Sequence, residues 1–444
     1  MKVKALPTDF GESGWTAVLS GRPQYPTVES SHTADWLIIG AGFTGLAAAR
    51  RLSQLRPQDR ILLLDAKRLA DGPVGRNSGF MIDLPHHLSA GSYVGEEASH
   101  DAQQTALNRS AIQFVLDAAE EHAIGRHIIN PCGKVNAAAT NRGIHQNQAY
   151  AAQLDLIGEA HSLLSAGDMR ALTGSDYYLG GLYTPGTVML QPAAYVYAMA
   201  KALPPKVDVY EASPVIELTR SGEDWIAQTP KGKITAAKCI LATNGHAVSF
   251  GYYEKQLVHI HLYASMSRAL TEDEIKVCGG EREWGLTPSD PAGSTVRRIQ
   301  TPDGDRIIVR NRIAYTPQLT TTDDKVTDFG VTQDASFRAR FPMLPKVDMQ
   351  YRWAGRLCLS RNEVPAFGEV EPNLYTACCQ NGLGAAQGTL SGIAAAELAS
   401  GETTERTRWF ADQARPSKLP PPWLTQVGAA ATIRWNEARA GRER

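Results

Sequence analysis

The stretch Asp35-Trp36-Leu37-Ile38-Ile39-Gly40-Ala41-Gly42-Phe43-Thr44-Gly45 decides the fold of this chain. A continuous apolar run, typical of a strand buried on both faces, passes directly into Gly-x-Gly-x-x-Gly. The residues that follow, 46–52, are rich in alanine and leucine and favour a helix. In such a turn Gly40 permits a tight bend, Gly42 lets the backbone approach a pyrophosphate, and Gly45 lets helix and strand pack closely.

A second apolar run completes the unit. Residues 61–64 read Ile-Leu-Leu-Leu and end on Asp65, so residues 35–65 form a strand–helix–strand unit with the length of a parallel crossover. The helix N-terminus offers free N–H groups to phosphates, and Asp65 is placed to accept hydrogen bonds from a ribose hydroxyl. The pattern predicts dinucleotide binding. The alternative is a glycine turn in some other parallel sheet.

Composition excludes several classes of protein. The chain has 444 residues, 43% of them hydrophobic, and its 45 Lys+Arg against 46 Asp+Glu give a formal net charge of −1. This balance argues against a nucleic-acid binder, and the apolar content argues against disorder. No apolar run reaches the ~18 residues of a membrane span, and the first thirty residues lack the apolar run of a signal peptide. The six cysteines form no CxxC pair, so we expect a reduced, cytoplasmic protein without a metal site.

A second glycine cluster follows the unit, at residues 71–80: Asp-Gly-Pro-Val-Gly-Arg-Asn-Ser-Gly-Phe. It resembles the Gly-x-x-Gly-Arg-Asn-Gly-Gly loop of flavin-dependent amine and amino-acid oxidases of the D-amino-acid oxidase superfamily. Residues 240–245 resemble that family's strand ending in an Ala-Thr-Gly-type motif, and Val215 resembles its adenine-side strand. Residues 381–384 resemble its glycine loop beside the pyrimidine end of the flavin.

Within the superfamily the chain is most similar to the gamma-glutamylputrescine oxidase-like branch, from about residue 13 to 435. The segments that carry this likeness are Trp15, Gly42–Gly45, Arg76–Asn77, Arg352–Gly355, Pro365–Gly368 and Trp409–Phe410. Three residues depart from the family pattern. Ser78 replaces a glycine, Leu383 a common histidine and Asp65 a glutamate; Asp65 is chemically equivalent toward a ribose, whereas Leu383 leaves covalent attachment of the flavin and oxygen reactivity open.

The resemblance implies FAD as the cofactor, in contact with the glycine loops and the strand ends beside them. The implied FAD-binding residues are Gly40, Gly42, Phe43, Thr44, Gly45, Asp65, Ala66, Lys67, Gly75, Arg76, Asn77, Ser78, Gly79, Phe80, Met81, Val215, Ala242, Thr243, Asn244, Gly245, Gly355, Asn381, Gly382, Leu383 and Gly384.

Substrate contacts are expected in the alternating-strand region between about 255 and 330. His259, His261 and Tyr263 share one face of a predicted strand and are candidates to bind or deprotonate the substrate; the alternative is that they are half-buried sheet residues. Arg310 is a candidate because an arginine fork suits a carboxylate, although a solvated strand face explains it equally well. Trp353 resembles a family position near the flavin, with core packing as its alternative.

Other residues inside and outside this region are further candidates. Arg297, Arg298, Arg306 and Arg312 concentrate positive charge around Arg310, within one hairpin. The pairs His86-His87 and Tyr177-Tyr178 are also candidates to approach the flavin.

The function implied is oxidation of a C–N bond in a primary or secondary amine, such as a gamma-glutamyl-amine or an amino acid. Hydride passes to flavin N5, water hydrolyses the imine to an aldehyde or oxo acid plus amine, and O2 reoxidises the flavin to give H2O2. One alternative passes the electrons to another acceptor, and a second is a flavin-binding protein without turnover. A third is an NAD-dependent dehydrogenase that uses only the first glycine motif.

The expected fold is mixed α/β: a three-layer Rossmann-like FAD-binding domain with an inserted, mostly antiparallel substrate domain. Residues 1–85, 166–251 and 351–402 are assigned to the former, and 86–165 and 252–350 to the latter. Residues 403–444 are expected to pack on the body as a tail. Helices are predicted over 100–125, 147–165 and 389–399, and a hairpin turns at residues 301–304.

Overall fold

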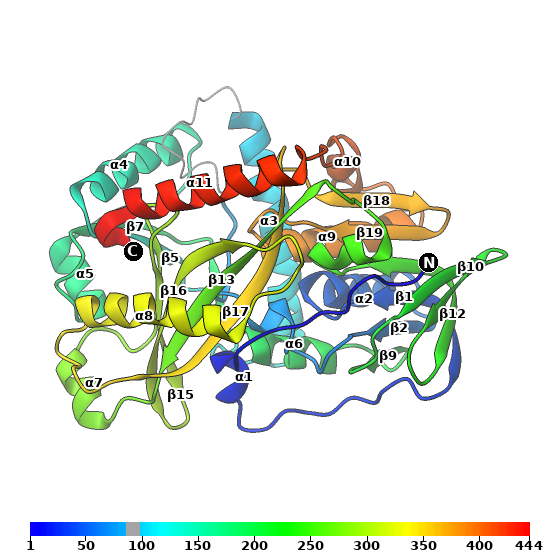
Figure 1. The fold of residues 1–444 in the computed structure, drawn as a ribbon, viewed down its shortest axis with the longest axis horizontal. Coiled ribbons are helices and arrows are strands. Elements are labelled where there is room, and N and C mark those ends of the chain that lie inside the picture. Colours follow the sequence, from blue (N-terminus) through cyan, green and yellow to red (C-terminus); the bar gives the residue numbers. More distant parts are fainter. Residues whose placement is uncertain (86–97) are drawn as a thin grey trace.

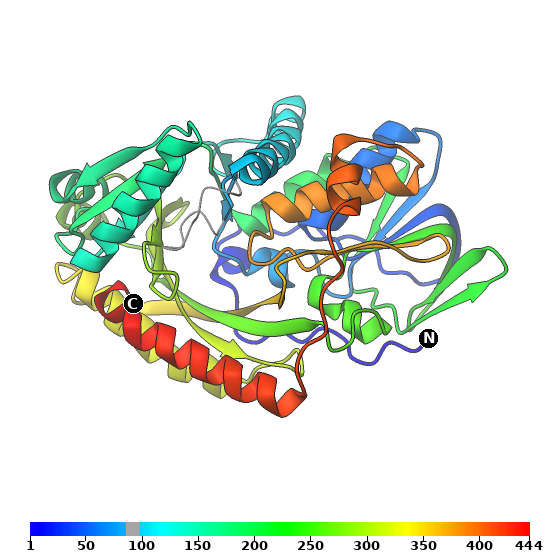
Figure 2. The same ribbon diagram turned by 90° about the horizontal axis from the view of Figure 1, so that it is seen from above.

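A computed structural model describes residues 1–85 and 98–444. It contains two large sheets that lie side by side (Figures 1 and 2), with the N-terminus beside the first and the C-terminus beside the second. Mixed α/β architecture is therefore confirmed. Within the described residues, no helix combines the length and apolar character that crossing a bilayer requires.

The first sheet is built around the predicted strand–helix–strand unit. β1 (Ser31–Ile39) pairs in parallel with β2 (Ile61–Leu64) and with β12 (Lys233–Leu241). β9 (Val207–Tyr210) and β19 (Leu374–Cys378) extend the parallel core on its two sides. The antiparallel strands β10 (Glu217–Ser221), β11 (Asp224–Gln228) and β18 (Ala366–Glu371) complete it.

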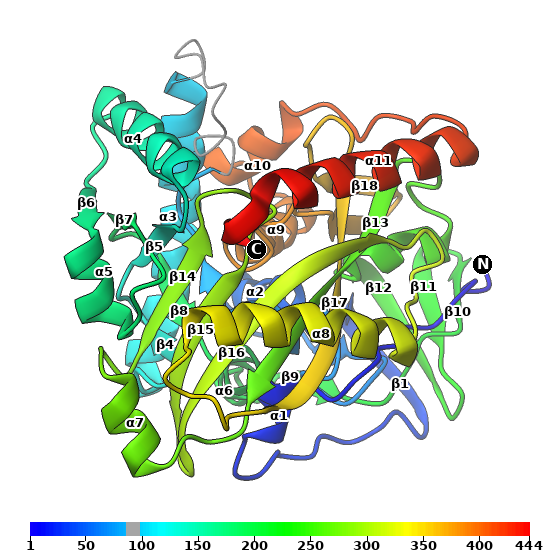
Figure 3. The same cartoon turned by 60° about the vertical axis from the view of Figure 1, so that its left-hand side comes forward.

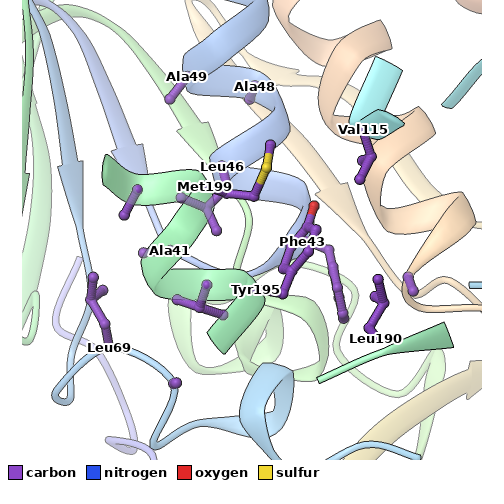
Figure 4. Packing of buried hydrophobic residues seen from close by; sticks show 14 of the residues in the cluster. Ala41, Phe43, Leu46, Ala48, Ala49, Leu69, Val115, Leu190, Tyr195 and Met199 are labelled. Atoms are coloured by element: carbon purple, nitrogen blue, oxygen red, sulfur yellow. The ribbon is translucent and has the colours of Figure 1, made fainter. Parts of the chain in front are cut away.

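Helices cover one face of this sheet. α2 (Phe43–Leu55) packs on α9 (Ala386–Ala399), on α6 (Pro192–Lys201) and on β2. Figure 4 shows the buried side of α2, where Phe43 and Leu46 lie against Tyr195 and Met199 of α6. The Phe43 and Tyr195 rings are 5.1 Å apart between centroids. This packing fixes the N-terminus of α2 above the ends of the parallel strands.

The second sheet is mostly antiparallel, with one parallel pair between β14 and β5. Its strands in spatial order are β17 (Met349–Ser360), β13 (Leu257–Ser267), β16 (Gly304–Tyr315), β15 (Thr295–Thr301), β14 (Trp284–Pro288), β5 (Lys134–Ala138), β7 (Gly180–Thr184) and β6 (Ser162–Ser165). The predicted hairpin at residues 301–304 joins β15 to β16. β3 (Phe80–Met81), β8 (Val188–Leu190) and β4 (Ile129–Asn130) form a third, small sheet that is not paired with either large sheet.

Two helices cover the outer face of the second sheet (Figure 3). α8 (Asp323–Arg340) contacts β13, β16 and β17, and α11 (Pro422–Ala440) contacts β16. Beyond α11, the Glu443 side chain accepts hydrogen bonds from the backbone N–H groups of Ala139 and Thr140. The C-terminal segment therefore joins strand β16 to the end of β5.

Two of the expected domain ranges are crossed by this pairing. β7 and β17 fall inside the ranges assigned to the nucleotide-binding domain, but β7 pairs with β5 and β17 pairs with β13 along its whole length. Conversely, α3 (Ala98–Glu121), expected in the substrate domain, packs on α9. Strand pairing between segments that are distant in sequence therefore puts β7 and β17 in the second sheet. The remaining boundaries stay a prediction.

The predicted helix over residues 147–165 is wrong in its limits. α4 (Asn141–Leu156) begins earlier, because the Thr140 side chain caps it by accepting a hydrogen bond from the backbone N–H of Gly143. It ends before Gly158, whose φ of +72° is left-handed. Residues 162–165 then form strand β6. α5 (Ala166–Thr173) and α7 (Glu272–Cys278) are short surface helices, and α10 (Glu405–Ala411) packs on α9.

Candidate active site

One cavity of about 590 Å³ is lined by residues of both large sheets. Gly40, Gly42 and Asp65 line it from the parallel sheet, and Lys134 and Arg310 line it from the second sheet. A small molecule that contacts the second sheet can therefore reach a cofactor held by the first.

The glycine turn after β1 is shaped as its sequence predicts. Gly40 has a φ of +108°, and a Cβ there would lie 2.6 Å from the Ala242 carbonyl oxygen. A Cβ on Gly45 would lie 1.8 Å from the Gly40 carbonyl oxygen, so only glycine lets α2 pack this closely. Gly42 faces open space, with Val74 as its sole neighbour at 3.7 Å. Among the residues that the structure describes, no side chain caps the start of α2, which leaves its N–H groups available to phosphate oxygens.

Asp65 lies directly after β2 and binds the same turn. Its Oδ2 accepts a hydrogen bond from the Ala41 backbone N–H at 3.1 Å, and its Oδ1 accepts one from the Lys67 N–H at 2.9 Å. Burial raises the pKa of Asp65 to about 6, although these two hydrogen bonds act in the opposite direction. At neutral pH the Asp65 carboxylate is ionised. It lines the cavity, where it is placed to accept hydrogen bonds from ribose hydroxyls.

Side chains from distant segments fix the second glycine loop from outside. Ser13 Oγ donates to the Gly75 carbonyl oxygen at 2.7 Å, and Trp15 Nε1 donates to the Asn77 carbonyl oxygen at 2.8 Å. Trp353 Nε1 donates to the Arg76 carbonyl oxygen at 3.0 Å. Trp353 does not line the main cavity; its indole supports the loop that does.

The expected FAD-binding residues divide into two groups. Those that line the cavity are Gly40, Gly42, Phe43, Thr44, Asp65, Ala66, Lys67, Arg76, Asn77, Ser78, Phe80, Val215, Ala242, Thr243, Asn244, Gly355, Gly382 and Gly384. Those that do not line it are Gly45, Gly75, Gly79, Met81, Gly245, Asn381 and Leu383. The two groups together form a cradle with open glycines, uncapped N–H groups and one carboxylate, which fits a dinucleotide.

The histidine face of β13 points away from the cavity. Ile260, Leu262 and Ala264 line the cavity, and strand alternation puts His259, His261 and Tyr263 on the opposite face. His261 Nδ1 is 2.7 Å from Thr316 Oγ1, and the Tyr263 hydroxyl is 2.6 Å from Thr321 Oγ1. The expectation that these three side chains contact the substrate is therefore corrected: they belong to the packed outer side of the strand.

Arg310 differs from the other arginines of its hairpin. Arg298, Arg306 and Arg312 form ion pairs with Asp305, Asp303 and Glu437, respectively. Arg297 donates to the carbonyl oxygens of residues 78, 79 and 190 and lies over the rings of Trp15 and Phe80.

The Arg310 guanidinium, in contrast, donates to two hydroxyls, Ser78 Oγ at 3.3 Å and Thr295 Oγ1 at 2.5 Å. It lines the cavity, and the part of the chain that the structure describes gives it no carboxylate partner.

Sequence reasoning missed the polar far end of the cavity. Lys134 and Asn136 on β5, Tyr150 on α4, and Thr287 and Ser289 at the end of β14 line it together. Their contiguity depends on the parallel pairing of β5 with β14, which joins segments about 150 residues apart in sequence. A lysine and an asparagine in the short buried strand Lys-Val-Asn-Ala-Ala were the available signal.

The N-terminal arm is a second missed part of the wall. Val3, Ala5, Leu6 and Pro7 line the cavity. The buried Asp9 anchors the arm through ion pairs with Arg356 at 3.1 Å and Lys67 at 3.3 Å. Arg356 also hydrogen-bonds His246, and burial together with the Arg356 charge lowers the pKa of His246 to about 3. His246 is therefore neutral at physiological pH.

The remaining candidates lie elsewhere. The Tyr177 hydroxyl donates to the Arg442 carbonyl oxygen, and Tyr178 is buried beside Arg340, so this pair packs near the C-terminus and not on the cavity. His86-His87 lies outside the described residues. All six cysteines are free thiols.

Sequence comparison decides the family. The family model described as DAO, FAD dependent oxidoreductase, matches residues 35–398. The chain belongs to this family of FAD-dependent oxidoreductases. FAD is therefore its cofactor, and the cradle described above is the part of the chain that fits it. The family match also rules out the NAD-dependent alternative, because it extends far beyond the first glycine motif.

Two bacterial relatives and two solved structures resemble the chain over most of its length. The probable oxidoreductase OrdL of Rhizobium meliloti is 26% identical and covers 90% of each chain. Gamma-glutamylputrescine oxidoreductase of Escherichia coli is 24% identical, covering 91% of this chain and 92% of its own.

Glycine oxidase of Geobacillus kaustophilus superposes with a TM-score of 0.65 at 16% identity, covering 84% of this chain and 96% of its own. L-proline dehydrogenase of P. horikoshii gives 0.64 at 16% identity, over 86% and 97%. These structures share the fold.

Proposed function

We propose that this chain oxidises the C–N bond of a primary or secondary amine by hydride transfer to N5 of FAD. The observation that carries the proposal is a cavity shared by the FAD cradle and the inner face of the second sheet. Ser78 and Arg310 illustrate the connection, because the second glycine loop and β16 meet at their side chains. The names of the similar proteins support an amine or an amino acid as the substrate.

The side chains around the cavity suit hydride transfer better than acid–base chemistry. FAD, when bound, supplies the acceptor for a hydride that leaves the carbon bearing nitrogen. Among the described residues that line the cavity, Asp65 carries the only carboxylate and His246 the only imidazole. The chain's part is then to orient a neutral amine and to limit water, after which hydrolysis of the imine gives an aldehyde or oxo acid plus an amine.

Molecular oxygen is the proposed final electron acceptor, with hydrogen peroxide as its product. A quinone or partner protein is the alternative acceptor, and a flavin-binding protein without turnover is the alternative of another class. The six free thiols support the cytoplasm as the proposed location.

The test is a panel of gamma-glutamyl amines, alkylamines and N-methyl amino acids, mixed with FAD-loaded protein in air and with an artificial electron acceptor. Peroxide release with at least one amine is the expected result. Turnover with the artificial acceptor but without peroxide would assign a dehydrogenase, and no turnover under either condition would leave the non-catalytic alternative.

A further inference from the structure

Lys134 is a buried cation that the described part of the chain does not neutralise. It lies on β5 with only 6% of its surface exposed, and it lines the far end of the cavity. Its Nζ donates to Asn136 Oδ1 and lies 3.4 Å from Thr287 Oγ1, and both partners are uncharged.

The nearby carboxylate of Asp83 does not serve as the counter-ion. Asp83 Oδ2 accepts hydrogen bonds from Arg109 Nε at 3.0 Å and from Arg109 Nη2 at 2.8 Å. No described carboxylate lies within ion-pair distance of Lys134. Burial lowers the pKa of Lys134 to about 8, so most of the molecules still carry the charge at pH 7. A buried ammonium without a partner is costly, and an anionic ligand group removes that cost.

The position of Lys134 sets the length of the ligand. Arg310, on β16, touches the second glycine loop through Ser78 and marks the end of the cavity nearest the cofactor cradle. The strand order β16-β15-β14-β5 puts Lys134 three strands farther along the same inner face. At about 4.8 Å per strand, the two backbones are roughly 14 Å apart. The two charged groups are closer than the backbones, because Arg310 donates to Thr295 on β15 and Lys134 Nζ contacts Thr287 on the neighbouring strand β14. One strand spacing, about 4.8 Å, still separates those two threonine backbones, so a group held by Lys134 is several bonds away from a carbon held near Arg310.

We propose that Lys134 binds a carboxylate remote from the oxidised C–N bond, which makes the preferred substrate an elongated amine with an acidic far end. The inference rests on the proposed amine oxidation and adds its specificity-determining residue. Asn136 and Thr287 orient the Lys134 ammonium toward the cavity by occupying its other hydrogen-bonding directions.

The test compares straight-chain amines with ω-amino acids of increasing length, from glycine to 6-aminohexanoate. Anaerobic reduction of the bound FAD is the readout, because it needs no assumption about the final electron acceptor. In the natural chain, kcat/KM or the equivalent second-order rate should favour 6-aminohexanoate over hexylamine by about 10- to 100-fold. Lys134→Met should bring that ratio close to one, and Lys134→Arg should retain part of it. Lys276→Met, at an exposed site on α7, is the matched control and should keep the ratio of the natural chain.

The possible failures are distinguishable. If no amine in the series reduces the FAD while dithionite does, the proposed function fails. If amines reduce the FAD but the ratio is near one in the natural chain, or is unchanged in Lys134→Met, the inference about Lys134 is wrong. Equal losses with both kinds of amine in Lys134→Met would also overturn it, because they would place Lys134 in catalysis and not in recognition of the far end. FAD content of each purified variant shows that it has folded.

Discussion

The backbone N–H of Ala41 donates a hydrogen bond to the Asp65 carboxylate at 3.1 Å, which joins the glycine turn after β1 to the end of β2. Two neighbouring parallel strands thus deliver a phosphate-binding turn and a ribose-binding acid to one point. Because the Asp65 carboxylate is buried, its ionisation, and with it the binding of FAD, should depend on pH.

FAD affinity should fall in acid. Burial raises the pKa of Asp65 from its ordinary value of 3.8 to about 6. Ribose hydroxyls donate hydrogen bonds to the ionised carboxylate, so FAD binding lowers the pKa of Asp65. The affinity for FAD is therefore fully present above pH 6 and is lost as the pH falls below 6. We expect the Kd of FAD to rise about tenfold from pH 7 to pH 5. Titration of the FAD-free protein with FAD over this range, followed by fluorescence, measures it.

Asp65→Asn is the control for that pH dependence. The amide cannot ionise, so the variant should bind FAD about 10- to 100-fold more weakly at pH 7, with little change between pH 5 and 7. An equally steep pH dependence in the variant would assign the effect to another group.

Gly42→Ala should separate cofactor binding from folding. A Cβ at Gly42 meets only Val74, at 3.7 Å, so the chain should fold with an unchanged melting temperature in the absence of FAD. The methyl group would occupy the space through which the turn approaches the pyrophosphate, and the variant should therefore be purified without flavin. Gly428→Ala, where a Cβ meets nothing within 4 Å, should retain it.

Gly45→Ala should instead damage the fold. Its Cβ would lie 1.8 Å from the Gly40 carbonyl oxygen, and backbone atoms cannot yield as a flexible side chain can. We expect the free energy of unfolding to fall by about 1–3 kcal/mol, measured by urea denaturation of the FAD-free protein. A stability equal to that of Gly42→Ala would contradict the close packing of α2 against the turn.

Trp15→Phe should weaken FAD binding from outside the cavity. The substitution removes the Nε1 donor to the Asn77 carbonyl oxygen and retains an aromatic ring under the loop. The loss of one hydrogen bond predicts a cost of about 1 kcal/mol, or roughly a fivefold higher Kd for FAD. Trp423→Phe, at an exposed indole of α11, should leave the Kd unchanged.

The cofactor cradle could be predicted from sequence because its parts are local. Gly40, Gly42, Gly45 and Asp65 belong to one strand–helix–strand unit. Gly45 is required by a contact within that unit and Gly40 by a contact with Ala242, which follows the neighbouring strand β12, whereas Gly42 leaves space open for a pyrophosphate. The second glycine loop was found by resemblance, but its supports were not. Ser13 and Trp15 lie 62 residues earlier in the sequence than the loop residues to which they donate hydrogen bonds.

The substrate side could not be read in the same way. The residues of β13 do alternate between polar and apolar, but the apolar residues Ile260, Leu262 and Ala264 line the cavity and the polar residues lie on the packed face. Polar character therefore indicated the wrong face. His259 and His261 share a face as predicted, but packing against α8 and the loop before it decides which face that is. Lys134 reaches the cavity only through the pairing of β5 with β14.

The most direct test of the central claim is a single-turnover experiment on the FAD-loaded protein without oxygen. We expect an amine to bleach the visible absorption of the bound flavin at a rate that saturates with amine concentration, because the substrate occupies the cavity first. A flavin that dithionite reduces, but that no amine in the panel reduces at any concentration, would contradict it.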